Sequence, residues 1–292
     1  MTTPRVVVVH RRSEYDELLR RHGTRGQAQF FLSTRGRSLD AVEEAHARLR
    51  RALDVVHASV PPDWRRGSVE RGELARFLFE PDDLVVVVGQ DGLVANVAKY
   101  LDGQPVLGVD PGVAGNLGVL TRHAPGEAAE LLPVLSGLPT EERTMVEARL
   151  DDGQCLTALN ELYVGHASHQ TARYRLASPG GTERQASSGV IVSTGTGATG
   201  WCRSAWLERR SPLTLPGPRD PVLAFFVREA WPSPATGTAH TEGLLTATDV
   251  LTLEVESDRL VVFGDGLEKD FLTASWGQSL EVRTSGRVLR LV

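Results

Sequence analysis

A short polar turn, GQDG (Gly89–Gly92), interrupts an otherwise apolar part of the chain. It follows the apolar run LVVVV (84–88) and leads directly into a helical pattern, LVANVAKYL (93–101). Such a turn points backbone N–H groups and the positive end of a helix dipole toward the space above it, which favours a phosphate group there. The turn therefore predicts an anion site with one carboxylate, Asp91, beside it. The alternative is a tight strand-to-helix turn in which Asp91 only caps the helix.

A second glycine-rich stretch, GVIVSTGTGATGW (189–201), contains the spacing G-x-G-x-x-G at Gly195, Gly197 and Gly200. In dinucleotide-binding dehydrogenases this spacing is followed by a long crossover helix, a parallel strand and an acidic residue about 20 positions on. Here only residues 202–210 can be helical before the interruption SPLTLPGPRDP, and the flanking pattern is typical of antiparallel strands. A dehydrogenase is therefore disfavoured. We expect the glycines to let a nucleotide lie against the backbone. Hydroxyl groups are available from Thr194, Thr196 and Thr199.

The first 120 residues alternate strand and helix patterns. Apolar runs predict buried strands at 6–9, 84–88 and 105–109, and helical patterns occupy 13–21, 72–79 and 93–101. From Ser38 to Val56 apolar residues recur every three or four positions, which predicts one long amphipathic helix that ends before Pro61. Asp40 and Glu43 have capping-box spacing at its start. These patterns predict a three-layer, Rossmann-like α/β domain with a parallel sheet between helices.

After Leu150 the pattern changes to a period of two. Leu251, Leu253 and Val255 alternate with polar residues, and so do Leu280 and Val282. This alternation predicts a β-rich, sandwich-like second domain. Residues 123–140 combine a short helix with a Pro- and Gly-containing loop. We therefore predict two domains, 1–140 and 141–292, with the active site in the cleft between them.

Composition narrows the class of protein. The chain has 292 residues, 41% hydrophobic residues and a net charge of −5, which disfavours nucleic acid as a partner. Cys155 and Cys202 are far apart in the sequence, so neither a disulfide framework nor a zinc site is indicated. The N-terminal run of four valines is too short for a membrane span. We expect a soluble cytoplasmic protein without a membrane partner and without a metal site made of protein ligands.

The GQDG turn resembles the GGDG motif of the NAD kinase family, and four further stretches follow in the family's order. GVDPGVAGNLGVL (108–120) is similar to its G-[IV]-N-x-G-x-L-G-F-L segment, and LNELYV (159–164) is similar to its N-[ED] motif. STGTGATGW (193–201) resembles its S-T-P-T-G-S-T-A-Y motif, and FGDGLEKD (263–270) resembles the D-G before its last strands. The resemblance covers roughly residues 80–290.

The resemblance implies an enzyme that transfers a phosphoryl group from ATP, with Mg²⁺, to the adenosine-ribose 2′-hydroxyl of NAD, giving NADP. It implies that Asp91 is the general base and that Gly89, Gln90 and Gly92 form the turn that holds the donor phosphates. Family members tend to be homo-oligomers, which implies a homodimer or homotetramer. The acceptor-binding residues that the resemblance implies are Asn160, Glu161, Thr194, Thr196, Gly197, Thr199 and Trp201.

Departures from the family pattern keep two alternatives open. Gln90 replaces a glycine and Leu93 a threonine, so side chains are expected to intrude where phosphates bind. Asp110 replaces an asparagine, and Trp201 replaces a tyrosine in the wall of the base site. These changes favour a kinase of the same fold that phosphorylates another hydroxyl, such as that of a nucleoside or a sugar. The other alternative is a catalytically silent protein that binds nucleotides.

Two further patterns have simpler interpretations. His166 and His169 form H-x-x-H, but on a predicted strand this spacing places them on opposite faces, so a metal pair is improbable. Arg173 and Arg175 flank Tyr174, which indicates a strand with one solvated face, and a phosphate clamp is the less favoured interpretation.

Overall fold

The computed structural model describes residues 3–112, 118–267 and 270–292. The chain forms two compact units, which are described separately here. Unit 1 consists of Met1–Thr140 and Arg290–Val292, and unit 2 consists of Glu141–Leu289.

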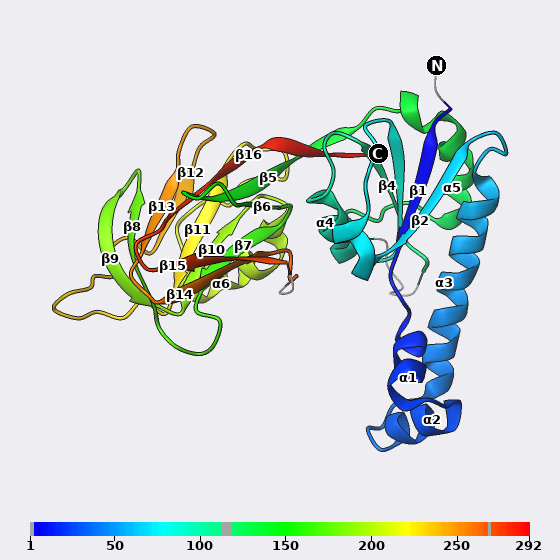
Figure 1. The fold of residues 1–292 in the computed structure, drawn as a ribbon, viewed down its shortest axis with the longest axis horizontal. Coiled ribbons are helices and arrows are strands. Elements are labelled where there is room, and N and C mark those ends of the chain that lie inside the picture. Colours follow the sequence, from blue (N-terminus) through cyan, green and yellow to red (C-terminus); the bar gives the residue numbers. More distant parts are fainter. Residues whose placement is uncertain (1–2, 113–117, 268–269) are drawn as a thin grey trace. The chain divides into compact units, whose positions relative to one another are not determined.

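Unit 1 is built on a parallel sheet (Figure 1). Its strands lie in the order β2 (Arg65–Glu70), β1 (Arg5–His10), β3 (Asp83–Val88) and β4 (Pro105–Val109). Arg290 and Leu291, near the end of the chain, pair in parallel beside β4. Every residue of β3 is buried, as its uninterrupted apolar run predicts for a strand that is covered on both faces.

Helices cover both faces of this sheet. The helices of unit 1 are α1 (Glu14–His22), α2 (Arg25–Ser33), α3 (Leu39–Ser59), α4 (Asp91–Ala98) and α5 (Pro125–Leu131), with short 3₁₀ turns η1 (Arg71–Arg76) and η2 (Leu132–Gly137). Helices α1 and α2 pack on the first part of α3 in a hydrophobic cluster of their own. One hydrophobic cluster joins α3 and α5 to one face of the sheet, and Figure 1 shows α4 on the other side. The predicted three-layer α/β architecture is confirmed.

Three local details of unit 1 differ from the sequence patterns. The cap of α3 is Ser38, whose hydroxyl accepts from the N–H of Asp40, so the predicted Asp40–Glu43 capping box is wrong. Glu43 instead accepts a hydrogen bond of 2.7 Å from Arg25. Strand β2 has no apolar run because it is an edge strand with charged, partly exposed residues, and its pattern gives no strand signal. The helix predicted at 72–79 is the shorter 3₁₀ turn η1.

Unit 2 is a sandwich of two mostly antiparallel sheets. One sheet contains β5 (Glu141–Leu150), β6 (Cys155–Ala158), β8 (Ala172–Ser178), β9 (Gly181–Ser187), β13 (Leu251–Val255) and β16 (Ser279–Leu291). The other has the order β12 (Glu242–Leu245), β11 (Leu223–Arg228), β10 (Gly189–Ser193), β7 (Glu161–Gly165), β14 (Arg259–Gly264) and β15 (Phe271–Ser275). Side chains of both sheets form one buried cluster, which confirms the predicted sandwich.

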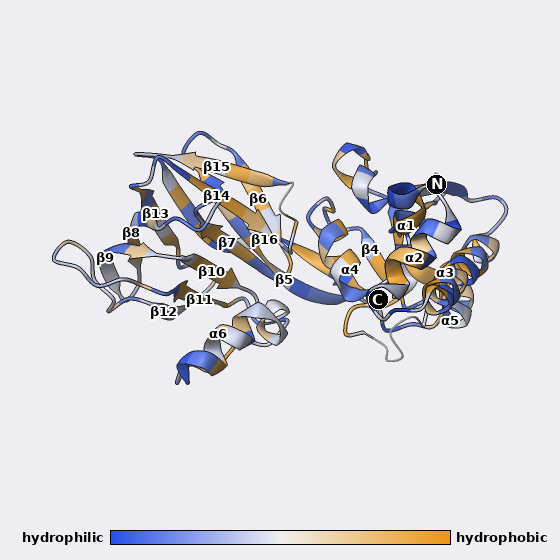
Figure 2. Ribbon diagram, turned by 90° about the horizontal axis from the view of Figure 1, so that it is seen from below, coloured by the Kyte–Doolittle hydropathy of each residue, from blue (hydrophilic) through white to orange (hydrophobic). Residues whose placement is uncertain are grey.

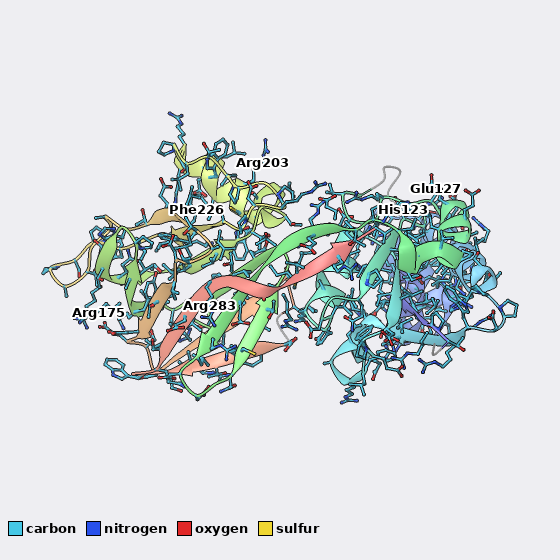
Figure 3. The ribbon with its side chains drawn as sticks, turned by 90° about the horizontal axis from the view of Figure 1, so that it is seen from above. His123, Glu127, Arg175, Arg203, Phe226 and Arg283 are labelled. Carbon is cyan, nitrogen blue, oxygen red and sulfur yellow. The ribbon has the colours of Figure 1, made fainter. Side chains whose placement is uncertain are left out.

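The helix after the glycine-rich stretch lies on the outer face of the second sheet. It is α6 (Trp201–Arg209), preceded by the 3₁₀ turn η3 (Gly197–Thr199). Buried Cys202 of α6 packs against Phe226 of β11, which Figure 3 labels beneath the helix, whereas the outer end of α6 is hydrophilic in Figure 2. Strand β11 then runs antiparallel to β10. A dinucleotide fingerprint requires a parallel strand here, so the dehydrogenase interpretation is excluded.

Other sequence interpretations have clear outcomes in unit 2. Strand β7 ends at Gly165, so His166 and His169 lie in a loop and not on a strand, and that expectation is wrong. On β8 Tyr174 is buried while Arg173 and Arg175 are exposed, which confirms the solvated face; Arg175 lies 3.5 Å from Glu254 (Figure 3). Among the helices of the described residues, not one has the length and apolar character that a membrane crossing requires.

Candidate active site

In unit 1 the carboxylate of Asp91 is held by the chain segment that follows β4. Its Oδ1 accepts from the N–H groups of Leu120 (3.0 Å) and Thr121 (2.9 Å) and from the hydroxyl of Thr121 (3.0 Å). Its Oδ2 accepts from the N–H of Val119 at 2.8 Å. Asp91 is the first residue of α4, and Gln90 is the N-cap residue without a side-chain cap bond. The alternative in which Asp91 caps its own helix is therefore wrong.

Two glycines let this segment approach Asp91. A Cβ on Gly118 would lie 2.1 Å from Oδ1 of Asp91, and one on Gly108 of β4 would lie 2.0 Å from the carbonyl oxygen of Leu120. Both distances are shorter than any real contact of a Cβ atom. The stretch 108–120 therefore needs these glycines to bring its N–H groups to the carboxylate. Residues 113–117 of that stretch lie outside the described residues.

The GQDG turn offers fewer phosphate donors than its glycines suggest. The N–H of Gly89 donates to the carbonyl of Val109 within the sheet, so it is already used. The N–H groups of Gln90, Asp91 and Gly92 donate to no acceptor in the described part of the chain, as is usual at a helix start. These three groups, together with the dipole of α4, make the start of α4 a candidate anion site.

The two departures within this turn behave differently. Gln90 is exposed and lines a pocket, as expected. Leu93 is only 2% exposed, and its side chain lies under Gly89, where a Cβ would be 3.0 Å from Leu93 Cδ2. The expectation that Leu93 intrudes into the phosphate site is therefore wrong, because its position on α4 points into the core.

In unit 2 three of the motifs meet at residues 159–161. The carboxylate of Asp265 accepts from the N–H groups of Leu159 (2.9 Å) and Asn160 (2.7 Å). Asp265 has a left-handed backbone (φ 53°), which aspartate tolerates better than most residues. The carbonyl of Asn160 in turn accepts from the N–H of Thr194 at 2.9 Å. Strands β7, β10 and β14 are neighbours in one sheet, which explains why segments far apart in sequence converge here.

The glycines of the GTGATG stretch pack against protein backbone. A Cβ on Gly195 would lie 1.9 Å from the carbonyl oxygen of Gly217, and one on Gly197 would lie 2.3 Å from that of Asn160. The space that a Cβ would occupy at these glycines is filled by backbone of the protein itself, so the expectation that it is open to a nucleotide is wrong. A contact of the Gly197 backbone with an acceptor stays a prediction.

The three threonines of this stretch differ in availability. The hydroxyl of Thr194 is buried and donates to the carbonyl of Leu159 at 2.6 Å, so it stabilises the turn. The hydroxyl of exposed Thr199 donates to the carbonyl of Thr196 at 3.1 Å. The hydroxyl of Thr196 is buried and has no hydrogen-bond partner among the described residues. A buried hydroxyl is normally paired, so Thr196 is the threonine with capacity for a ligand.

Trp201 belongs to a row of aromatic rings on the outer face of the sheet. It stacks on Tyr163 with ring centroids 5.5 Å apart and an angle of 22°, and Tyr163 also contacts Phe263 at 5.0 Å. The ring of Tyr163 lies so close to the backbone that Gly165 and Gly189 admit no Cβ beneath it. The Arg228 guanidinium lies 5.3 Å from the Trp201 ring. The indole is 37% exposed, so part of it is free to contact a ligand.

Glu161 has an unusual electrostatic environment. Burial raises the pKa of its carboxyl to about 7, and the nearby negative charge of Asp265 contributes in the same direction. At neutral pH Glu161 is therefore protonated in about half of the molecules, and it can both donate and accept hydrogen bonds.

We expect Glu161→Gln to stabilise unit 2 in a pH-dependent way. A pKa raised from 4.5 to about 7 means that the folded state binds more protons in this window, so wild-type stability falls as pH rises from 4.5 to 7. Glutamine does not ionise, so the stability of the variant does not fall in this pH range for this reason. Its free energy of unfolding should exceed that of wild type by about 1–3 kcal/mol at pH 8 and differ little near pH 4. Denaturant titrations at both pH values test this, with exposed Glu281→Gln as the control. A constant difference across pH would contradict it.

We also expect Thr121 to position Asp91. Thr121→Val removes the hydroxyl that donates to Oδ1 and keeps the shape, whereas Thr121→Ser keeps the hydroxyl. Loss of a hydrogen bond to a charged group costs about 1.5–3 kcal/mol. Turnover should therefore fall about tenfold or more in the valine variant, with the KM values little changed, and recover in the serine variant. Equal rates in both variants would show that the hydroxyl has no such role.

The geometry thus contains two motif clusters. Unit 1 joins the GQDG turn to the segment after β4, and unit 2 joins the N-[ED], threonine-rich and D-G motifs. An α/β unit with a candidate anion site and a β-sandwich that carries carboxylates and aromatic rings are the two parts that the motifs of a kinase of this kind predict.

Part of the chain is similar to known proteins. No family profile matches the chain. The NAD kinase of Methylococcus capsulatus is 37% identical over 175 residues, which are 56% of this chain and 56% of that protein. The NAD kinase of Symbiobacterium thermophilum is 39% identical over 135 residues (42% and 46%), and that of Escherichia coli O1:K1 is 32% identical over 161 residues (52% and 54%). The chain spans about half the length of these curated relatives. These similarities support membership of the NAD kinase family, in agreement with the resemblance of its motifs.

Sequence reasoning missed several residues of these clusters. Asp265 lies within a recognised motif, but its hold on residues 159 and 160 could not be read from the sequence. Thr121 follows directly after the matched segment 108–120, and Gly118 lies inside it. The only signal for either is the glycine-rich character of this segment.

Proposed function

We propose that the chain catalyses ATP-dependent phosphorylation of the 2′-hydroxyl on the adenosine ribose of NAD, giving NADP. The single observation that carries the proposal is the Asp91 carboxylate, which four donors fix at the start of α4. It lies next to three N–H groups that have no acceptor among the described residues. The relatives' name, NAD kinase, supports NAD as the acceptor.

Asp91 is proposed as the proton acceptor, and its two oxygens are not equivalent. Oδ1 already accepts from three donors, whereas within the described ranges Oδ2 accepts only from Val119. Oδ2 therefore retains the capacity to take a proton. As the ribose oxygen forms its bond to the γ-phosphorus, the bond from that phosphorus to the oxygen of the leaving ADP breaks, and the hydroxyl proton moves to Oδ2.

The donor phosphates are proposed to bind the N–H groups of Gln90, Asp91 and Gly92. Gly89 contributes by lacking a side chain above Leu93 and not by donating a hydrogen bond. Phosphoryl transfer depends mainly on positioning and charge neutralisation, which fixed N–H groups and a helix dipole can supply.

Mg²⁺ is proposed to accompany the nucleotide. Within the described residues no three His, Cys, Asp or Glu side chains converge on a common point. Mg²⁺ usually binds through substrate phosphates and water with one or two carboxylates, so a site of this kind fits an ion that is bound to ATP. The ion would neutralise charge on the transferred phosphoryl group.

Residues of unit 2 are proposed to hold the acceptor. Asn160 and Glu161 offer an amide and a half-ionised carboxyl for the ribose hydroxyls. Thr196 offers a hydroxyl that has no partner in the described part of the chain. The exposed part of the Trp201 indole can cover the base. Thr194, Gly197 and Thr199 shape this turn through their contacts with the backbone.

One observation favours a second candidate, phosphorylation of a smaller acceptor such as a nucleoside or sugar. The Trp201 indole is stacked on Tyr163 and flanked by Arg228, so the family's tyrosine site is narrowed by a larger ring. This larger ring penalises a long dinucleotide more than a compact acceptor.

A phosphorylation screen tests both candidates. Purified protein is incubated with labelled ATP and Mg²⁺ and, in separate reactions, with NAD, NADH, nucleosides or sugars. We expect NAD to be labelled at the 2′ position. Labelling of another acceptor without NAD would favour the second candidate, and labelling of none of the acceptors would favour a silent nucleotide-binding protein.

A further inference from the structure

A pocket of about 180 Å³ lies in unit 1 at the carboxyl ends of β1 and β3. In the strand order, β1 lies between β2 and β3, so the connection from β1 leads to the neighbour on one side and β3 is the neighbour on the other. This place is a topological switch point, where crevices of open α/β sheets bind their ligands. Gly89 and Gln90 line one side of the pocket, so it adjoins the anion site of the GQDG turn.

The floor of the pocket is apolar. It is formed by Val42, Ala45 and Leu49 of α3, which recur at intervals of three and four and therefore share one helix face. Val42 and Leu49 are 5% and 8% exposed. An apolar floor favours a flat organic group and gives no advantage to a ligand that consists of phosphate alone.

The rim of the pocket is cationic. Arg11 and Arg12 follow β1 and line the pocket. Arg11 is exposed and forms no ion pair with any residue in the described ranges, whereas the Arg12 guanidinium lies 3.6 Å from the Glu70 carboxylate. The acidic lining residue Glu14 is paired with Arg37, which lowers the pKa of Glu14 and offsets its charge. Two guanidinium groups therefore line the pocket beside the phosphate turn, and that of Arg11 is the one whose charge no ion pair within the described ranges offsets.

A histidine with a fixed ring orientation completes the lining. Nδ1 of His46 lies 2.7 Å from the hydroxyl of Ser13. Ser13 is itself held in a capping box with Asp16 at the start of α1. Because Nδ1 is engaged in this way, Nε2 is the ring nitrogen that can bond to a ligand in the pocket.

We propose that this pocket binds the nucleoside part of the phosphoryl donor. The base lies on the α3 floor, and the phosphates extend past Arg11 and Arg12 to the N–H groups of the GQDG turn. This inference rests on the proposed function and extends it. The residues after β1 and on α3 that line the pocket belong to none of the family motifs, and they select a nucleoside triphosphate over inorganic polyphosphate.

Binding to the full-length chain tests the proposal without requiring turnover. Calorimetric titrations use ADP and tripolyphosphate as probes. Ala45→Phe fills the floor and should weaken ADP binding at least about tenfold while changing tripolyphosphate binding less than about threefold. Ala41→Phe, at an exposed position on the same helix, is the matched control and should change neither. Arg11→Ala, also at an exposed position, should weaken both probes because it acts on phosphates.

Several outcomes would overturn the inference. These are wild-type ADP affinity in Ala45→Phe, no measurable ADP binding by the wild-type chain, or equal loss of both probes in Ala45→Phe. Thermal unfolding of each variant separates pocket filling from misfolding, and Arg11→Ala tests the same pocket without altering the core. If ADP binding follows the prediction but NAD is not phosphorylated, the proposed acceptor is wrong and the donor pocket stands. If NAD is phosphorylated equally well with polyphosphate, the pocket inference alone is wrong.

Discussion

Asp91→Asn should lower kcat for the true acceptor by about 10²–10⁴-fold, the usual contribution of a general base. The amide oxygen can occupy the position of Oδ1 and keep its three donors, Leu120 N–H, Thr121 N–H and the Thr121 hydroxyl. The amide nitrogen then faces the N–H of Val119, so one hydrogen bond is lost and the proton acceptor disappears. Binding of ADP should change little. Steady-state rates and ADP titrations on the same preparation measure both effects.

The control for this prediction is Asp82→Asn, at an exposed carboxylate just before β3. It should retain wild-type activity. If Asp91→Asn stays within about threefold of wild type, Asp91 is a structural clamp for the segment 118–121 and not a base. A variant that loses ADP binding and thermal stability together with activity would support the same structural role.

Gly195→Ala should destabilise unit 2 by about 3 kcal/mol or more, which is large for a single methyl group. The added Cβ would stand 1.9 Å from the carbonyl oxygen and 2.1 Å from the carbonyl carbon of Gly217. Both are backbone atoms, so no side-chain rotation relieves the clash. The segment around Gly217 or the turn before η3 must move, and with it Thr196 and the residues that follow.

Denaturant titration and calorimetric thermal unfolding both measure this loss of stability, with Gly286→Ala as the control. Gly286 is exposed on β16 and has open space where a Cβ would stand, so that variant should lie within about 0.5 kcal/mol of wild type. Equal stability of the two variants would show that the backbone contact at Gly195 is not tight. Acceptor KM in Gly195→Ala should rise together with the loss of stability, because the same turn carries Thr196 and Trp201.

The amino-acid sequence by itself determined the elements and the chemistry-bearing residues. Burial on both faces produces an uninterrupted apolar run at β3, and burial on one face produces the period-two pattern of β13, so local patterns report these strands. Asp91 could be found because it stands in a polar turn between an apolar run and a helical pattern, and Glu161 because its stretch resembles the N-[ED] motif of a known family. Edge strand β2 was missed because it is partly exposed and carries charges.

Only the tertiary structure decided what each of these residues touches. Asp91 meets Thr121, Asp265 holds residues 159 and 160, and Gly195 meets Gly217, all across separations that no sequence period encodes. These contacts depend on which strands are neighbours in the sheets. The same holds for Leu93, which points into the core because α4 is buried along that face. It also holds for the raised pKa of Glu161, which requires burial and a second carboxylate, that of Asp265, from the turn after β14.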